Sequence, residues 1–213
     1  MQPDAVEIRV LGCLLEKQRT TPDAYPLTLN ALRLACNQTT NRDPVVEYDE
    51  ATIRDALRRL SERRWTRTAS GAGSRAAKFR HLFDEAMGLA DDEIALLTVL
   101  MLRGPQTPGE LKSRTERLHP FADLSEVLET LERLAERDLA EELPRRPGEK
   151  QVRWRQLVGG NEDGGEAQAP AAAPAAEAGP DPVAERLERL EAEVAALRAE
   201  LTRIKDELGP RPY

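Results

Sequence analysis

The residues best suited to bind a polyanion lie between positions 51 and 80. This stretch holds nine Lys or Arg residues against two acids, Asp55 and Glu62, a local excess of seven positive charges. Guanidinium and ammonium groups bind phosphate oxygens, and guanidinium also pairs with guanine edges in the major groove. The candidate contacts to double-stranded DNA are Arg54, Arg58, Arg59, Arg63, Arg67, Arg75, Lys78 and Arg80.

The same arginines allow a second interpretation. Asp55 precedes Arg59 by four residues and Arg58 precedes Glu62 by four, so each pair shares one face of a helix. Such a face can be a solvated, salt-bridged surface instead of a groove reader. The leading hypothesis is a DNA-binding protein, such as a transcriptional regulator, that uses the third helix and hairpin of the first copy. The alternative is a protein–protein interaction scaffold of the same fold that binds no DNA.

A polar stretch, CNQTTNRDPVVEY, occupies positions 36–48. Asn37 is a candidate left-handed cap at the end of a helix, and Asp43-Pro44 is a candidate turn. Nothing local requires the amide of Asn41 or the guanidinium of Arg42. These two side chains either brace a helix junction or contact a ligand.

No arrangement of residues indicates an enzyme. His81 and His119 are the only histidines, and neither has a metal-ligand spacing with the two cysteines, Cys13 and Cys36. Cys13 falls near an apolar stripe, which favours a buried thiol, although a Cys13–Cys36 redox switch stays an alternative. No Gly-rich phosphate loop precedes a helix, and no nucleophile elbow occurs. We expect no catalytic residue, no metal and no cofactor.

The elements that position these residues occur twice. VLGCLLEKQRTTP at 10–22 aligns with LLTVLMLRGPQTP at 96–108, and EATIRDALRRLSERRW at 50–65 aligns with LSEVLETLERLAERDL at 124–139. Each copy closes with two short segments around a Gly-containing turn, which predicts a β-hairpin. Thr21 and Thr107 both precede Pro, so we expect each to cap the second helix of its copy.

Three helices and a hairpin, found twice, predict a mainly helical α+β fold with two tandem winged-helix domains. The expected bounds are 1–83 and 84–158 for the two domains, 159–182 for a disordered linker of Gly, Ala, Pro and acid, and 183–208 for a coiled-coil helix. The two alignments have offsets of 86 and 74, so the first copy carries an insertion of 12 residues. The third helix of the second copy is rich in Glu, so only the first copy is expected to bind DNA.

The C-terminal segment predicts self-association. Its apolar residues follow one another at spacings of 4 and 3, the pattern of a coiled-coil seam. Charged pairs beside the seam favour a parallel homodimer, a trimer stays open, and the alternative is one amphipathic helix folded against the body. The predicted dimerisation residues are Leu187, Leu190, Val194, Leu197, Leu201 and Ile204.

The charge and the cysteine content suggest a compartment. Residues 159–213 hold 12 acids and 6 bases, so this tail supplies −6 of the net charge of −7. Two cysteines do not form a disulfide framework, and no apolar run reaches the length of a membrane span. We therefore expect a cytoplasmic protein without membrane contact.

Several long strings resemble one known family. GCLLEKQRTTPDAYPLTLNAL, ACNQTTNRDPV, RTASGAGSRAAKF and MLRGPQTPGELKSR are similar to sequences of the YceH-like family of bacterial proteins. The resemblance runs from about Val6 to Val158, with a similar coiled-coil tail beyond. It implies a tandem winged-helix architecture. The family has no established biochemical activity, so the resemblance implies no catalytic residue.

Overall fold

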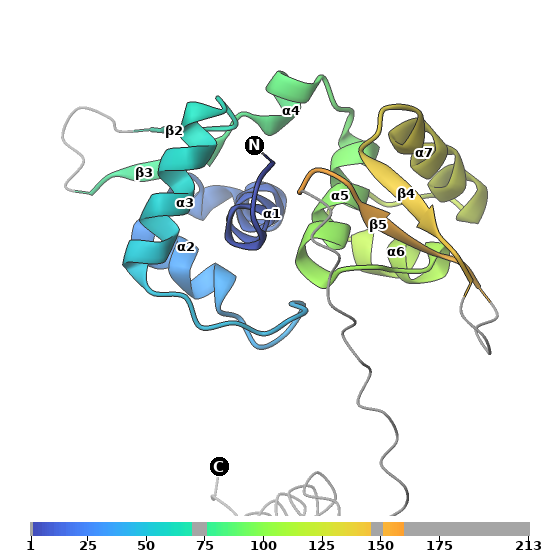
Figure 1. Cartoon of the computed structure of the whole chain (residues 1–213), viewed down its shortest axis with the longest axis horizontal. Helices are drawn as coiled ribbons and strands as arrows, with labels where there is room; N and C mark the ends of the chain where they lie inside the picture. Colours follow the sequence, from blue (N-terminus) through green and yellow to red (C-terminus); the bar gives the residue numbers. More distant parts are fainter. Residues whose placement is uncertain (1, 70–75, 146–150, 160–213) are drawn as a thin grey trace, which may run out of the picture. The chain divides into compact units, whose positions relative to one another are not determined.

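The computed structural model describes residues 2–69, 76–145 and 151–159. Helices dominate these residues, and the strands form two small antiparallel sheets (Figure 1). The described part of the chain is thus mainly helical α+β, as the repeated helix-and-hairpin pattern predicts. Repeat 1 denotes residues 2–83 and repeat 2 denotes residues 84–159.

The two repeats follow the same order of elements. Repeat 1 contains α1 (Ala5–Thr20), the 3-10 turn η1 (Pro22–Ala24), β1 (Leu27–Thr28), α2 (Leu29–Cys36), α3 (Glu50–Glu62), β2 (Thr66–Thr68) and β3 (Lys78–His81). The short helix α4 (Phe83–Met87) leads into repeat 2, which contains α5 (Asp91–Arg103), α6 (Pro108–Thr115), α7 (Leu124–Glu136), β4 (Ala140–Leu143) and β5 (Arg153–Gln156).

The sheets of the two repeats also correspond. In repeat 1 the strand order is β1-β3-β2, and β3 is antiparallel to both neighbours. In repeat 2, β4 pairs antiparallel with β5. A single bridge between Gln106 and Trp154 takes the place that the β1–β3 pairing has in repeat 1. Each hairpin therefore has a third segment beside its last strand, contributed from just before the second helix.

The third helices, α3 and α7, are built alike. Asp49 and Asp123 cap them, each by accepting a hydrogen bond from the backbone N–H three residues later. The helices end at Glu62 and Glu136, and shortly after these ends Arg64 (φ 62°) and Asp138 (φ 54°) adopt the left-handed conformation that closes a helix. The expected apolar positions are buried in both: Ile53, Leu57 and Leu60 in α3, and Val127, Leu131 and Leu134 in α7.

The second helices begin differently. The Thr107 hydroxyl caps α6 by accepting a hydrogen bond from Glu110 N (3.3 Å), as expected. Thr21 makes no cap bond to a following backbone N–H, and Thr28 instead caps α2 by accepting from Ala31 N (3.2 Å). The expectation for Thr21 was wrong because η1 and β1 come between Thr21 and the helix.

The two repeats pack through α1 and α5, and their buried side chains form one apolar cluster. Gly12 on α1 lies where α5 approaches closely. A Cβ atom at this position would lie 3.0 Å from Leu102 Cδ2 and 3.2 Å from Met101 Cβ. The absence of a side chain at Gly12 therefore allows the two central helices to meet.

The insertion of repeat 1 folds into a closed loop, residues 37–48, which we call the junction loop. The Asn37 side chain closes its base: Nδ2 donates to Tyr48 O (2.8 Å), and Tyr48 N donates to Asn37 Oδ1 (2.9 Å). The Asp43 N–H donates to Leu102 O (2.9 Å) at the end of α5. The polar stretch thus joins repeat 1 to repeat 2.

Asn37 does not have the left-handed backbone expected of it. Its φ is −93°, and its amide makes the two bonds to Tyr48 instead. The left-handed residue of the junction loop is Asn41, with φ 60°. The expectation for Asn37 was wrong because the helix ends without a left-handed residue and the turn comes four residues later.

Some expectations concern other parts of the chain. Within residues 2–69, 76–145 and 151–159, no helix is both long and apolar enough to cross a membrane. Arg75, nearly all of the predicted linker and the whole coiled-coil seam from Leu187 to Ile204 lie outside the described residues. Self-association through that seam stays a prediction.

We expect Gly12→Leu to destabilise the protein, because the new side chain has no space between α1 and α5. Overpacking of a core costs about 1–3 kcal/mol. The matched control is Gly109→Leu on α6, where the nearest atom to a new Cβ is Gln151 Oε1 at 4.0 Å. Urea denaturation gives both free energies of unfolding. A loss for Gly12→Leu no larger than that for Gly109→Leu would contradict the close packing of the two repeats.

Candidate nucleic-acid interface

Helix α3 carries most of the arginines that the sequence offers for DNA contact. Its buried face packs against α1 and α2, so the arginines lie on its remaining faces. Each of the four candidates on α3 or directly after it is ion-paired with at least one carboxylate. These four are Arg54, Arg58, Arg59 and Arg63.

Arg58 is held between two acids of its own helix. Nη2 lies 2.8 Å from Asp55 Oδ1, and Nη1 lies 2.6 Å from Glu62 Oε1. Arg59 also pairs with Asp55, so both pairs that the spacing predicts are present. The hydrogen bonds from Arg58 lower the pKa of Asp55, which keeps this carboxylate ionised beside the arginines.

Arg59 and Arg63 contact acids at the start of α1. Arg59 Nη2 lies 2.7 Å from Asp4 Oδ2, and Arg59 Nε lies 3.1 Å from Glu7 Oε2. Arg63 Nε lies 3.4 Å from Glu7 Oε1, and its guanidinium covers the ring of Trp65 at 5.7 Å. The Glu7 side chain is only 3% exposed, so both arginines point back toward the protein body.

The outer pairs are looser. Arg54 Nη2 lies 3.8 Å from Glu50 Oε2, between two exposed side chains. Arg80 on β3 pairs with Glu85 of α4 at 3.2 Å. Exposed pairs of this kind contribute little to stability, about 0–1 kcal/mol, so a ligand could displace them.

The hairpin of repeat 1 holds the remaining candidates. Among the described residues, Arg67 and Lys78 form no ion pair, and neither does Arg64 at the base of the hairpin. Arg67 lies directly opposite Arg80 across the β2–β3 ladder. Because Arg67 and Lys78 have no carboxylate partner among the described residues, the hairpin carries more unmatched positive charge than α3.

Arg42, one of the two candidate loop contacts, is buried. Its guanidinium donates to Glu16 Oε2 (2.6 Å), to Ala35 O (3.1 Å) and to Gln38 Oε1 (2.9 Å). Its side chain is 0% exposed. Burial opposes the charged form, but Glu16 and Cys13 together outweigh it, and the pKa of Arg42 is raised. Arg42 braces the junction loop against α1 and α2.

Asn41, the other candidate, contacts repeat 2. Its side-chain oxygen accepts a hydrogen bond from Arg103 at the end of α5. Asn41 is exposed, and the bond adds to the link between Asp43 and Leu102. Both candidate loop residues therefore make contacts within the protein.

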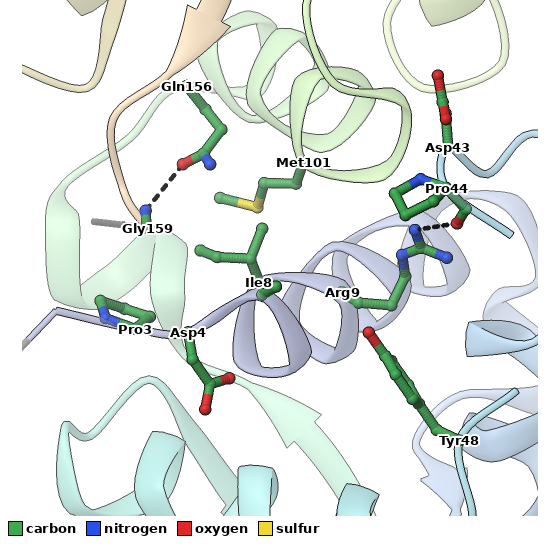
Figure 2. A pocket seen from close by; sticks show the side chains of 11 residues that line it. Pro3, Asp4, Ile8, Arg9, Asp43, Pro44, Tyr48, Met101, Gln156 and Gly159 are labelled. Atoms are coloured by element: carbon green, nitrogen blue, oxygen red, sulfur yellow. Dashed lines mark hydrogen bonds between the residues drawn. The ribbon is translucent and has the colours of Figure 1, made fainter. Parts of the chain in front are cut away.

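A pocket of about 210 Å³ lies beside this junction, between α1, the junction loop, α5 and the end of β5. Figure 2 shows Arg9 at its side, with the carboxylates of Asp4 and Asp43 directed away from Ile8 and Met101. The buried Arg9 donates to Cys36 O (3.2 Å) and to Pro44 O (2.6 Å). Arg9 thus holds the end of α2 and the junction loop to α1.

The other reactive groups are buried as well. Cys13 and Cys36 are free thiols with 0% exposure. His81 is buried and lies against Gln18 and Asp84, and its burial lowers its pKa. The described residues contain no cluster of His, Cys, Asp and Glu that could hold a metal ion.

Sequence reasoning missed the role of the first turn of α1. Asp4 and Glu7 form a capping box there, with bonds of 2.8 and 3.1 Å. The D-x-x-E spacing before an apolar run is a signal for a helix start. It does not show that the same carboxylates reach Arg59, 55 and 52 residues later in the chain.

Comparison with known proteins places the chain beside a large bacterial group. Residues 4–149 match the family described as "Protein of unknown function, DUF480". A UPF0502 protein of Opitutus terrae is 50% identical over 196 residues, which cover 91% of this chain and 82% of that protein. A UPF0502 protein of Dechloromonas aromatica is 49% identical over 200 residues (91% and 92%), and one of Shewanella sp. strain MR-7 is 44% identical over 209 (95% and 94%).

We expect Arg42→Met to destabilise the protein strongly, because it removes the bonds that hold the junction loop. Breaking a buried ion pair costs about 3–5 kcal/mol. The control Arg33→Met removes an arginine of α2 that bonds only to the exposed Asn30 side chain, and should cost about 0.5 kcal/mol or less. Chemical denaturation measures both. Similar losses for the two variants would show that Arg42 does not brace the loop.

Proposed function

The chain belongs to the UPF0502/DUF480 family of bacterial proteins, and we propose that it is a tandem winged-helix scaffold that binds other proteins. The order of helices and strands in repeat 1, with the sheet β1-β3-β2, supports a winged-helix assignment. Repeat 2 follows the same order. Winged-helix folds serve as DNA-binding domains and as protein-binding modules, so the fold alone does not distinguish the two functions. The charge of the exposed surface does.

The charge balance of the outer face of α3 carries the proposal. Four arginines, at 54, 58, 59 and 63, are matched by five carboxylates within ion-pair distance. These five are Glu50, Asp55, Glu62, Asp4 and Glu7. A phosphate that displaced one pair would still face the acids beside it, and the net potential would not attract a polyanion. This surface is better suited to a protein partner of mixed charge.

Matched variants test whether α3 binds DNA. We expect Arg58→Gln to bind a labelled DNA duplex no more weakly than the wild type, because Arg58 is already neutralised. Asp55→Asn/Glu62→Gln frees Arg58 and should gain affinity together with a steeper dependence on salt. Fluorescence anisotropy of the full chain at several salt concentrations measures both. A duplex affinity of Arg58→Gln that is about tenfold weaker than that of the wild type would overturn the proposal.

A second measurement tests the protein-binding side. The full chain is purified from cells that express it naturally, and the extract is treated with nuclease. The purified chain should retain a protein companion at a fixed ratio. A protein companion that is lost on nuclease treatment would indicate that the chain binds nucleic acid.

DNA binding through the hairpin of repeat 1 is a second candidate, carried by a different observation. Arg67 faces Arg80 across the β-ladder, and Lys78 is unpaired among the described residues. A phosphate backbone could pair with Arg67 and Lys78, as in winged helices whose hairpin contacts DNA. The double variant Arg67→Gln/Lys78→Gln should then lose duplex affinity relative to a matched control, Arg117→Gln/Lys112→Gln in repeat 2. Equal affinities for the two would exclude this candidate.

A further inference from the structure

The basic residues in and directly after α7 pair with acids of another helix, α5, whereas α3 also contains ion pairs between its own residues. The basic residue of α7, Arg133, pairs with Asp92, and Nη1 of Arg137, directly after the helix, lies 3.2 Å from Glu93 Oε2. Arg137 also donates to the carbonyl oxygens of Met87 and Gly88. Both guanidinium groups are therefore engaged at the start of repeat 2.

Of the four acids of α7, Glu126 lies 3.8 Å from His119 Nε2, and the other three have no cationic partner among the described residues. Glu129, Glu132 and Glu136 are exposed, and in the described part of the chain none of them pairs with Lys or Arg. Glu129 accepts one hydrogen bond, from the Ser125 hydroxyl at 3.3 Å. Positions at i, i+3 and i+7 share one side of a helix, so these three carboxylates lie in one row, and Arg133 beside the row pairs with Asp92.

Two exposed leucines lie beside this row. Leu124 is 43% exposed and Leu128 is 37% exposed, and they are one turn apart on α7. The helical spacing places them between the buried Leu131 and the acidic row. We call Leu124, Leu128, Glu129, Glu132 and Glu136 the α7 stripe. An apolar seam with one acidic flank is a surface that an amphipathic helix can cover.

We propose that the α7 stripe binds a basic amphipathic helix of a partner protein. The proposal rests on the scaffold function and specifies the chemistry of its partner. Apolar side chains of the partner would cover Leu124 and Leu128, and its Lys or Arg residues would pair with the unmatched glutamates. The third helix of repeat 2 thereby takes the role that the third helix has in a DNA reader, with the opposite charge.

The charge of the stripe argues against other occupants. A second copy docked by a two-fold axis would place the same glutamates against one another, because such an interface pairs identical surfaces. Nucleic acid and anionic lipid surfaces would be repelled for the same reason. A basic helix is the partner whose charge complements the stripe.

The experiment uses a synthetic, fluorescently labelled amphipathic helix of Leu and Lys, about 14 residues or four turns long. A scrambled peptide of the same composition, which cannot form one apolar face, is the control ligand. The full chain should bind the amphipathic peptide at least about tenfold more tightly than the scrambled one. Equal binding of both peptides would reduce the interaction to general charge attraction and overturn the proposal.

Variants locate the binding surface. Leu128→Ser should weaken binding of the amphipathic peptide by about tenfold, as loss of a central apolar contact does. Glu132→Gln/Glu136→Gln should weaken it severalfold and flatten its dependence on salt. The matched controls are Leu34→Ser and Glu47→Gln, which change an exposed leucine and an exposed acid of repeat 1 and should leave binding unchanged.

The outcomes separate this proposal from the scaffold function. Peptide affinity that is equal in wild type and α7 variants, or absent, overturns the α7 stripe as a docking site. If the α7 variants still retain a protein companion after nuclease treatment, the chain acts as a scaffold through a surface other than the α7 stripe. All substituted positions are exposed, so thermal melting should give one transition close to that of the wild type for each variant.

Discussion

The carboxylate of Glu7, buried in the first turn of α1, contacts the guanidinium groups of both Arg59 and Arg63. It also accepts the backbone N–H of Asp4 and so helps to start the helix. One side chain thus joins the N-terminus of the fold to the helix that a winged-helix protein normally presents to DNA. Because the glutamate is buried, its pairs are screened less than exposed ones. This contact holds the Arg59 and Arg63 guanidinium groups against the protein body.

The two repeats use one scaffold for different surfaces. α3 and α7 share their caps, their buried positions and their left-handed ends. Among the described residues, however, α3 balances its charges, whereas Glu129, Glu132 and Glu136 of α7 have no cationic partner. The junction loop and the close contact at Gly12 hold the repeats together, so both surfaces belong to one body. A scaffold that presents two chemically distinct helices can contact two partners, or two parts of one partner. DNA recognition would require neither the charge-balanced surface of α3 nor the acidic surface of α7.

Local patterns predicted what local physics determines. Apolar spacing gave the third helices and their buried faces, and the four-residue spacing of Asp55 and Arg59 gave an ion pair that is present. Long-range contacts could not be predicted in this way, because the pairing of Glu7 with Arg59 depends on how α1 packs against α3. The same limit explains the junction loop. The sequence left Arg42 open between bracing a helix junction and contacting a ligand, and packing against Glu16 makes it a brace. Thr21 was a plausible cap by local sequence, but an unpredicted strand, β1, separates it from α2, and Thr28 caps the helix instead.

We propose that the arginines of α3 are ion-paired with carboxylates and do not bind DNA phosphates. The most direct measurement is NMR of the arginine Nε–Hε groups of the full chain, recorded while a DNA duplex is added at low salt. The signals of Arg58, Arg59 and Arg63 should stay in place throughout, and any shifts should be confined to the hairpin residues. Progressive, saturable shifts of these three signals would contradict the account and return α3 to the role of a DNA-reading helix.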